Sequence, residues 1–173
     1  MELKAVKTAI GHTQEVEQLM NAVLFFIHPE QYRASVKIQQ KLRSAPPDDR
    51  IPGHMETWPS VFMGETWVIN RLTYPHRDRA GMDTTYDLIA NAGHAAAKLF
   101  LRDLGLCLHY NRSDVVALTG RFLTHEVPQW EGYDRICSVR YLKAQLFKLM
   151  EVPEPGWSTV EQMSHTLRMD LDK

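Results

Sequence analysis

The chain has 173 residues, of which 44% are hydrophobic and 24% charged, and a formal net charge of −1. This balance is typical of a globular protein and excludes a largely disordered chain. A protein that holds nucleic acid by phosphate contacts usually carries a basic excess, so any such binding here requires a local basic patch. Two clusters could provide one: Arg71, Arg77 and Arg79, and further upstream Arg33, Lys37, Lys41 and Arg43.

The length predicts one domain with a small extension, which we place at residues 1–157 (core about 58–150) and 158–173. Cys107 and Cys137 stand in strand-like apolar runs without Cys-x-x-Cys spacing, so buried, reduced thiols are expected. The first residues lack the apolar core of a signal peptide. The longest apolar run, Ala22 to Ile27, is far shorter than the roughly 20 residues that span a bilayer. We expect a soluble, intracellular protein.

In chain order, the first predicted element is a helix over residues 13–27, capped by Thr13. Its apolar residues recur at helical spacing, at Val16, Leu19, Met20, Val23 and Leu24. Pro29 breaks this helix, and a second one is expected from Glu30 to about Leu42. Residues 44–53 hold three prolines and are predicted to form a loop.

From Val61 onward, short segments rich in β-branched, aliphatic and aromatic residues are separated by turn residues. Strands are expected within residues 61–70, 97–105, 106–110, 114–120, 121–127 and 135–143. Such a series predicts an antiparallel sandwich or barrel. A last helix is expected over 141–152, and the tail from Ser158 is amphipathic enough for a short helix. The predicted fold is α+β, mostly β, with two N-terminal helices on a distorted jelly roll.

The segment His76-Arg77-Asp78 carries the chemistry that we predict. In an extended chain, residues i and i+2 point to the same side, so His76 and Asp78 can face one metal ion. A distant histidine on a neighbouring strand can complete a facial triad, which leaves open positions on iron(II) for a keto acid and dioxygen. His125 ends a predicted strand, and Arg135 follows it at a distance suited to bidentate binding of a carboxylate.

The motifs PHRD, LTHEV and DRICSVRY resemble those of the 2-oxoglutarate/iron oxygenases of double-stranded β-helix fold. Among these, the chain looks most like the TET/JBP branch, particularly its short fungal members, over roughly residues 28–157. Further support comes from the segments WPSVFMGETWVINRLTYPHRD, DLG and VVALTGRFLTHEV. The resemblance implies a double-stranded β-helix core flanked by the N-terminal helices.

By this resemblance, iron(II) is bound by His76, Asp78 and His125, and 2-oxoglutarate is clamped by Arg135. Arg140 is the alternative clamp, because family members differ in this spacing. Asn70 matches a strand position whose asparagine helps to hold the co-substrate, although a strand asparagine bonded only to the backbone is equally expected. From the residues alone, His76 and Asp78 could also belong to a solvated loop, and Arg135 could pair with Asp134 or Glu131.

The family oxidises 5-methylpyrimidines in DNA, so the resemblance implies methylated duplex DNA as partner, with the target base flipped into the site. We expect conversion of 5-methylcytosine to 5-hydroxymethylcytosine and further products, in the nucleus rather than the cytoplasm. Tyr86, Phe62 and Trp130 could stack on the flipped base, although aromatic residues in such places usually belong to the core. Two alternatives remain: oxidation of another methylated base, such as N6-methyladenine or a base in RNA, and a non-oxidising, cupin-like metal- or DNA-binding module.

Overall fold

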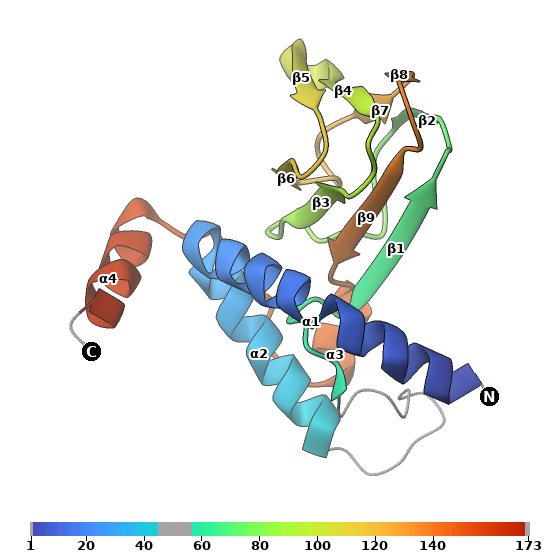
Figure 1. Cartoon of the computed structure of the whole chain (residues 1–173). Helices are drawn as coiled ribbons and strands as arrows, with labels where there is room; N and C mark the ends of the chain where they lie inside the picture. The colour runs from blue at the N-terminus through green and yellow to red at the C-terminus, as the bar shows by residue number, and fades with distance from the viewer. Residues whose placement is uncertain (1, 45–56, 172–173) are drawn as a thin grey trace. The chain divides into compact units, whose positions relative to one another are not determined.

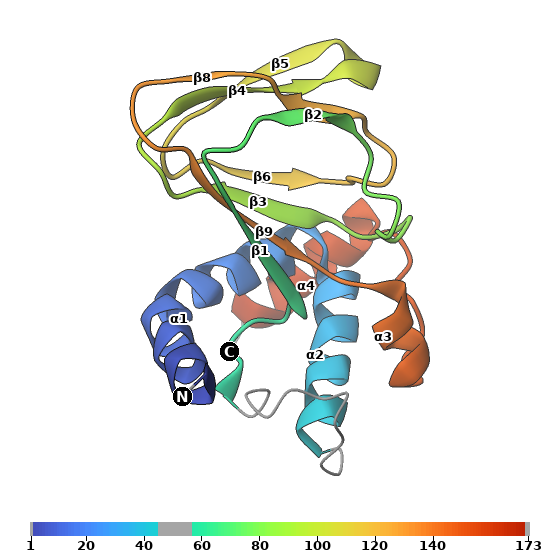
Figure 2. The same ribbon diagram turned by 90° about the vertical axis from the view of Figure 1, so that its right-hand side faces the viewer.

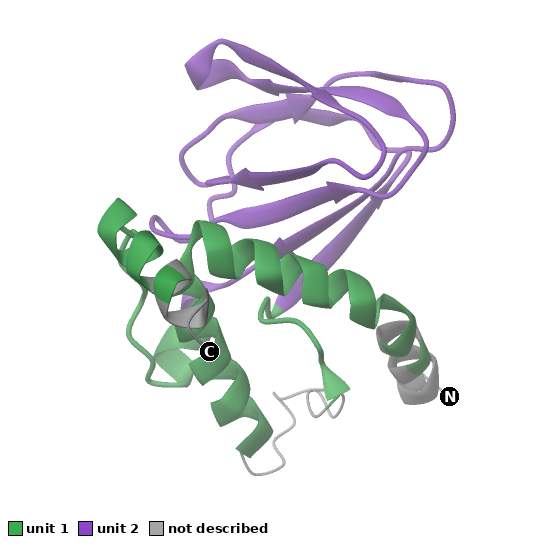
Figure 3. Cartoon of the chain, turned by 60° about the vertical axis from the view of Figure 1, so that its left-hand side comes forward, with its two compact units in different colours: residues 1–63, 145–173 green, residues 64–144 purple. Residues whose placement is uncertain are grey.

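The computed structural model describes residues 2–44 and 57–171, except for some side chains near the two ends. The chain divides into two compact units (Figure 3), one of residues 64–144 and one of residues 1–63 with 145–173. The predicted iron ligands and the predicted 2-oxoglutarate contacts all lie in the unit of residues 64–144. The proposed boundary between a body over 1–157 and a tail over 158–173 stays a prediction.

The helical unit contains α1 (Glu2–Ile27), α2 (Pro29–Ser44) and α4 (Val160–Leu171), together with most of α3 (Ala144–Leu149) (Figure 1). α1 packs against α2, and α4 contacts both. His28 separates α1 from α2, and its Nδ1 accepts a hydrogen bond from the N–H of Gln31 (3.3 Å). The imidazole therefore caps the first turn of α2 in the way an Asn or Ser side chain would.

Two helix predictions differ from the structure at their ends. α1 begins at Glu2 rather than at Thr13, so the prediction was too short. An interior glycine costs a helix about 1 kcal/mol relative to alanine, a cost that the helix formers around Gly11 override. α3 is shorter than the predicted 141–152, because Tyr141 still belongs to a strand. Most of the predicted loop over 44–53 lies outside the described residues.

The tail forms the helix that its amphipathic pattern allowed. Thr159 begins it with a capping box: the N–H of Gln162 donates to Thr159 Oγ1 (3.2 Å), and the N–H of Thr159 donates to Gln162 Oε1 (2.7 Å). No helix among the described residues is long and apolar enough to cross a membrane.

The β-rich unit, residues 64–144, is described throughout and consists of two antiparallel sheets. One has the order β1-β9-β3-β6, and the other the order β2-β7-β4-β5 with β8 paired to β4. Figure 2 shows the sheets as two layers. The strands are β1 (Gly64–Ile69), β2 (Thr73–His76), β3 (Asp87–Asn91), β4 (Ala96–Leu101), β5 (Leu106–Tyr110), β6 (Val115–Leu118), β7 (His125–Val127), β8 (Trp130–Glu131) and β9 (Ile136–Tyr141).

The chain moves back and forth between the two sheets, so β1, β3, β6 and β9 lie in one and β2, β4, β5 and β7 in the other. This is the jelly-roll topology of a double-stranded β-helix, and it confirms the predicted fold class. It also brings together strands that are far apart in sequence. β2 pairs with β7, and in their register His76 lies opposite His125.

Apolar side chains from both sheets pack together between them, including Val68, Ile89, Leu99, Leu118 and Val127. β3 is buried along its whole length and is not among the predicted strands, since its apolar run is too short to show alternation. Both cysteines are free, as expected. Cys137 is buried, but Cys107 is exposed because it lies on the face of β5 opposite to the fully buried Tyr110, which corrects the expectation for that thiol.

Candidate metal centre and its cavity

The structure brings His76, Asp78 and His125 together at one end of the paired strands β2 and β7. Their ligand atoms all lie within 4.8 Å of one another. His76 Nε2 is 3.6 Å from Asp78 Oδ1, and His125 Nε2 is 3.6 Å from Asp78 Oδ2. The two imidazole rings are tilted against each other with centroids 4.2 Å apart. Among the described residues, this is the one group of three such side chains close enough to share an ion.

The backbone fixes the orientation of both imidazole rings in the same way. His76 Nδ1 lies 2.8 Å from the carbonyl of Tyr74, and His125 Nδ1 lies 2.9 Å from the carbonyl of Leu123. A carbonyl only accepts, so Nδ1 must carry the proton in each ring. In the neutral form of each ring, Nε2 then has its lone pair on the side of Asp78, which is the tautomer that a metal requires.

The surroundings of His125 favour its neutral imidazole form. Burial lowers the pKa of His125, and the neighbouring His76 lowers it further, although the Leu123 carbonyl and Asp78 act in the opposite direction. Two neutral imidazole nitrogens and one carboxylate are the donor set of non-haem iron(II) sites. The residues present therefore fit iron(II), which would be held by His76, Asp78 and His125.

A polar network holds the two ligand-bearing segments together. Arg77, between the first two ligands, donates through Nε to Thr124 Oγ1 (3.0 Å) and through Nη2 to Asp103 Oδ1 (3.0 Å). Asp103 Oδ2 accepts the N–H of Thr124, next to His125. These hydrogen bonds, that of Thr124 first, lower the pKa of Asp103. Asp103 begins the DLG segment seen in the sequence.

Gly120 allows the close approach that positions Asp78. The N–H of Asp78 donates to the carbonyl of Gly120 (2.9 Å). A Cβ at position 120 would lie 2.3 Å from Asp78 Oδ2, well inside van der Waals contact. A side chain at this position would therefore displace the carboxylate from the centre.

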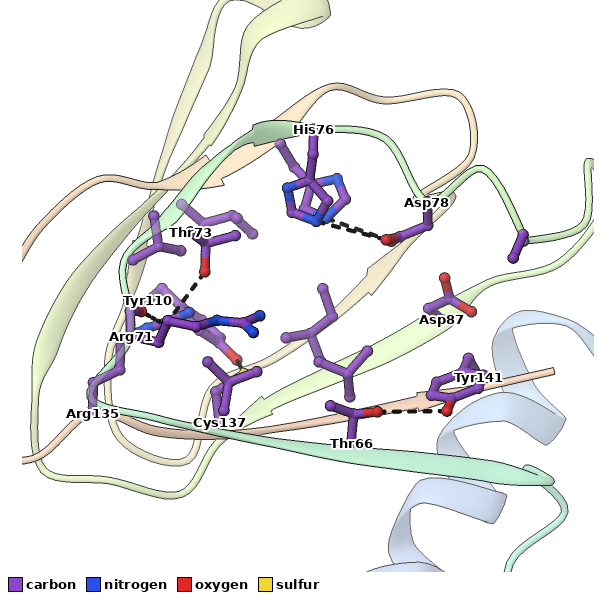
Figure 4. Close-up of a pocket in the computed structure, with 18 of the residues that line it drawn as sticks. Thr66, Arg71, Thr73, His76, Asp78, Asp87, Tyr110, Arg135, Cys137 and Tyr141 are labelled. Carbon is purple, nitrogen blue, oxygen red and sulfur yellow. Dashed lines mark hydrogen bonds and ion pairs between the residues drawn. The ribbon is translucent and has the colours of Figure 1, made fainter. Parts of the chain in front are cut away.

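A cavity of about 310 Å³ lies between the two sheets and reaches the three candidate ligands (Figure 4). Arg135, immediately before β9, is 3% exposed and lines it. Its Nη1 donates to the carbonyl of Arg71 (2.6 Å) and to Thr73 Oγ1 (3.5 Å), whereas its buried Nε has no hydrogen-bond partner. Burial lowers the pKa of the guanidinium, but an arginine stays charged in a protein. The structure thus leaves a buried cation with free donor capacity facing the cavity.

Arg140 lies on the other face of β9. Residues 135, 137, 139 and 141 line the cavity, and alternation along a strand turns residue 140 away from it. Arg140 donates to Ser138 Oγ (2.7 Å) and forms an ion pair with Glu65 (3.1 Å). The structure therefore brings Arg135 to the cavity and leaves Arg140 outside it.

Asn70 is not among the residues that line the cavity. It adopts a left-handed backbone conformation (φ 48°) after β1. Its Oδ1 accepts the N–H of Arg135 (2.9 Å), and its Nδ2 donates to Asp134 Oδ1 (2.7 Å). The side chain thus fixes the segment that carries Arg135 and makes no direct approach to the cavity.

The three aromatic residues that the sequence offered for base stacking do not line the cavity. Phe62 is buried in the helical unit, and Trp130 packs against the apolar core. The aromatic residues that line it are Tyr110 and Tyr141, which the sequence analysis missed. Tyr141 shares the parity of Arg135 along β9, so strand alternation could have identified it.

The fold separates the members of the first predicted basic cluster, Arg71, Arg77 and Arg79. Arg71 lines the cavity, whereas Arg77 and Arg79 line a shallow hollow beside His76 with Arg121 and Thr124. Arg77 is paired with Asp103, and Arg121 with Asp83. The side chain of Arg79 has no partner among the described residues.

The model of a known family, Tet_JBP, described as the oxygenase domain of the 2OGFeDO superfamily, matches residues 2–144. That is most of the chain. The chain belongs to this family. As a member of Tet_JBP, it is an oxygenase domain of a superfamily that uses iron(II) and 2-oxoglutarate, and the donor set of its candidate metal centre agrees with that chemistry.

Solved structures give the same fold. A structure described as NgTET1 in complex with 5mC DNA matches with a TM-score of 0.54 and 14% identity, covering 92% of this chain. The chain spans 56% of the length of that structure. A comparison with curated protein sequences gives no match. The resemblance to the TET/JBP branch and the double-stranded β-helix fold are both confirmed by these findings.

Proposed function

We propose that this Tet_JBP domain is an iron(II)- and 2-oxoglutarate-dependent dioxygenase that oxidises the methyl group of 5-methylcytosine in DNA to 5-hydroxymethylcytosine and further products. The observation that carries the proposal is the cavity itself. It joins a His-Asp-His group to a buried arginine whose donors are only partly used, and it is enclosed by the two sheets.

The chain's own residues have separate tasks in this proposal. His76, Asp78 and His125 hold iron(II). Arg135 binds the distal carboxylate of 2-oxoglutarate, because a guanidinium recognises a carboxylate bidentately and without water competition when buried. Thr73 and Tyr110, which line the same end of the cavity, add hydroxyl groups beside that carboxylate. Arg140 has no such task, because its contacts are with Ser138 and Glu65.

Bound iron(II) and 2-oxoglutarate supply the oxygen activation: one oxygen atom enters the substrate methyl, the other enters succinate, and carbon dioxide leaves. The protein positions the methyl and excludes water. A base within a duplex cannot reach a cavity between two sheets, so the methylated base is flipped. The NgTET1 structure, which is a complex with 5mC DNA, supports this substrate class for the present chain. We propose a nuclear location on the same ground.

DNA contacts must be local, because the net charge of the chain is −1. The hollow lined by Arg77, Arg79 and Arg121 borders His76, so a backbone phosphate near the flipped nucleotide would meet it. Arg77 and Arg121 are paired with aspartates, whereas the guanidinium of Arg79 has no partner among the described residues. We infer that Arg79 contributes a phosphate contact.

The test is anaerobic loading with iron(II) and 2-oxoglutarate, followed by air and a methylated duplex, with succinate and oxidised nucleosides measured by mass spectrometry. We expect 5-hydroxymethylcytosine with matching succinate. His76→Ala should abolish both products, and His109→Ala, which removes an exposed imidazole on β5, should retain them. If succinate forms and a different base is oxidised, the substrate is that base and not 5-methylcytosine. Metallated protein that forms no succinate would contradict the dioxygenase assignment.

A further inference from the structure

Three connections of the β-rich unit meet at the end of the sheets that carries the candidate metal centre. His76, which ends β2, pairs with His125, which begins β7, and Leu101, which ends β4, pairs with the same His125. In the other sheet, the first residue of β3 pairs with the last residue of β6. These pairings bring three connections to one end: residues 77–86, 102–105 and 119–124.

Phe122 is the one exposed aromatic residue of these three connections, all of which the structure describes. Its side chain is 48% exposed, although its backbone is fixed. The carbonyl of Thr119 accepts both the N–H of Phe122 (3.0 Å) and that of Leu123 (3.1 Å). The side chain of Leu123 packs against the apolar core. A rigid turn therefore presents the ring to solvent.

The same turn is bonded to the segment that carries Asp78. The N–H of Asp78 donates to the carbonyl of Gly120 (2.9 Å). Arg121 donates through Nη1 to the carbonyls of Arg79 (2.9 Å) and Gly81 (3.1 Å), and its Nε forms an ion pair with an aspartate of the same connection. The position of the Phe122 ring is thus fixed relative to the candidate metal centre.

The surroundings of Phe122 are basic. Arg121, the residue before it, lines the shallow hollow beside His76 together with Arg77 and Arg79. A single exposed apolar side chain is normal on a protein surface. A fixed aromatic ring next to several guanidinium groups is instead typical of a nucleic-acid contact, in which cations meet the phosphates and an apolar side chain enters between the bases. Because the turn is already ordered, such insertion costs little further conformational entropy.

We propose that Phe122 is a wedge that enters the DNA duplex and occupies the space that the flipped base leaves. This inference rests on the proposed function, because only a base drawn out of a duplex leaves such a space. Flipping breaks the base pair and the stacking on both neighbours. An aromatic ring in the space replaces part of the lost stacking and stabilises the opened duplex. A single strand contains no base pair to open, so the wedge gives no such advantage there.

The experiment compares kcat/KM for one 5-methylcytosine in single-stranded DNA, in a duplex with the target mispaired, and in a fully paired duplex. Phe122→Ala should lower the value for the paired duplex by about tenfold or more. The loss should be smaller for the mispaired target, which is easier to open, and absent for the single strand. Phe122→Trp should retain activity on the paired duplex, because it keeps an aromatic ring. Trp67→Ala, which removes an aromatic residue of similar exposure (47%) from β1, is the matched control and should change none of these values.

Two further measurements separate a wedge from damage to the metal centre. The visible absorbance band of the anaerobic iron(II) and 2-oxoglutarate complex should be retained in Phe122→Ala. The affinity of that complex for the three substrates should fall in the same order as kcat/KM.

Several results would overturn this inference and leave the proposed function standing. One is a ratio of paired-duplex to single-strand kcat/KM that stays at the wild-type value in Phe122→Ala while 5-methylcytosine is still oxidised, including an equal loss on both. Another is wild-type protein that oxidises 5-methylcytosine only in single strands. Wild-type protein that forms succinate but oxidises 5-methylcytosine in none of the three substrates would overturn both proposals.

Discussion

The two faces of the sheet that contains β9 treat their buried polar groups differently. On the outer face, Arg140 is bonded to Ser138 and paired with Glu65. On the face towards the cavity, Arg135 has a buried Nε without a hydrogen-bond partner, and Asp87 has no side-chain partner among the described residues. The two arginines are only five positions apart. Burial alone therefore does not distinguish the two faces, whereas the presence of a side chain of opposite charge does.

This difference separates structural from ligand-binding groups, because the two roles place opposite demands on a buried charge. A structural charge is stable only when the protein itself supplies its partners, since an unpaired buried charge costs several kcal/mol. A ligand-binding charge must keep part of its capacity free until the ligand arrives. Equal effects of truncating Arg135 and Arg140 on stability and on 2-oxoglutarate binding would contradict this separation of roles.

The largest expected effects come from truncating these two arginines. Arg135→Ala should raise the KM for 2-oxoglutarate by about thirtyfold or more, because a buried carboxylate would lose its charged partner. The thermal midpoint of this variant should change little. Arg140→Ala should instead lower stability by about 3–5 kcal/mol, since it leaves the half-buried Glu65 without its ion pair, while the KM for 2-oxoglutarate stays near wild type. Succinate kinetics and thermal unfolding, measured on both variants, decide between these outcomes.

Gly120→Ala should weaken iron binding next most strongly. Its new Cβ would meet Asp78 Oδ2 at 2.3 Å, and the carboxylate would have to move away from the two imidazole rings. We expect the iron(II) dissociation constant to rise by about tenfold to a hundredfold. Gly156→Ala is the matched control, because nothing lies within 4 Å of the added atom. Iron(II) titration monitored by the 2-oxoglutarate absorbance band would show the difference, and equal affinities would contradict the assigned role of Gly120.

Asp103→Asn tests whether the network around Arg77 positions the ligands. The variant weakens the bonds to Arg77 and to the N–H of Thr124, so we expect iron(II) affinity to fall by about tenfold. The pKa of Asp103 is lowered in the folded protein, so its contribution is present above its unfolded pKa and is lost as pH falls through the lowered value. An iron affinity of Asp103→Asn that equals wild type at neutral pH would show that the backbone alone sets the geometry.

Much of the fold and the pairing of His76 with Asp78 could be predicted from sequence, because both depend on short-range patterns. Turn residues between short apolar segments predicted the jelly roll, and the i, i+2 spacing of His76 and Asp78 in extended chain placed both on one side. Its spacing from His125 favoured Arg135 as the 2-oxoglutarate clamp. Only the structure shows which of Arg135 and Arg140 lies on the cavity side of β9. The roles of these residues in binding iron and 2-oxoglutarate stay predictions.

The position of Asp87 in the cavity lining could not be predicted, and the reason is physical. Asp87 begins a strand whose apolar run is too short to show a period, and a single aspartate before Leu88 looks like an ordinary turn residue. Only the pairing of β3 with β6 and β9 brings it into the cavity. For Asn70 the sequence left two roles equally expected, a contact with the co-substrate or a bond to the backbone, and the structure shows its Oδ1 accepting the N–H of Arg135.

Arg79→Ala should produce the smallest effect, a modest loss of DNA binding. It tests on the surface whether an unpaired charge, rather than a paired one, binds the ligand. Arg77 and Arg121 in the shallow hollow are already paired with aspartates, so they should contribute less to phosphate binding than Arg79 does. Arg79→Ala should weaken binding of duplex DNA by about threefold to tenfold, equally for methylated and unmethylated sequences. It should also reduce the slope of log K against log salt by about 1. Arg112→Ala, in the turn between β5 and β6 and bonded to His94, is the control and should leave the slope unchanged. A sequence-dependent loss in Arg79→Ala would indicate a contact with the base instead, because a phosphate contact carries no information about sequence.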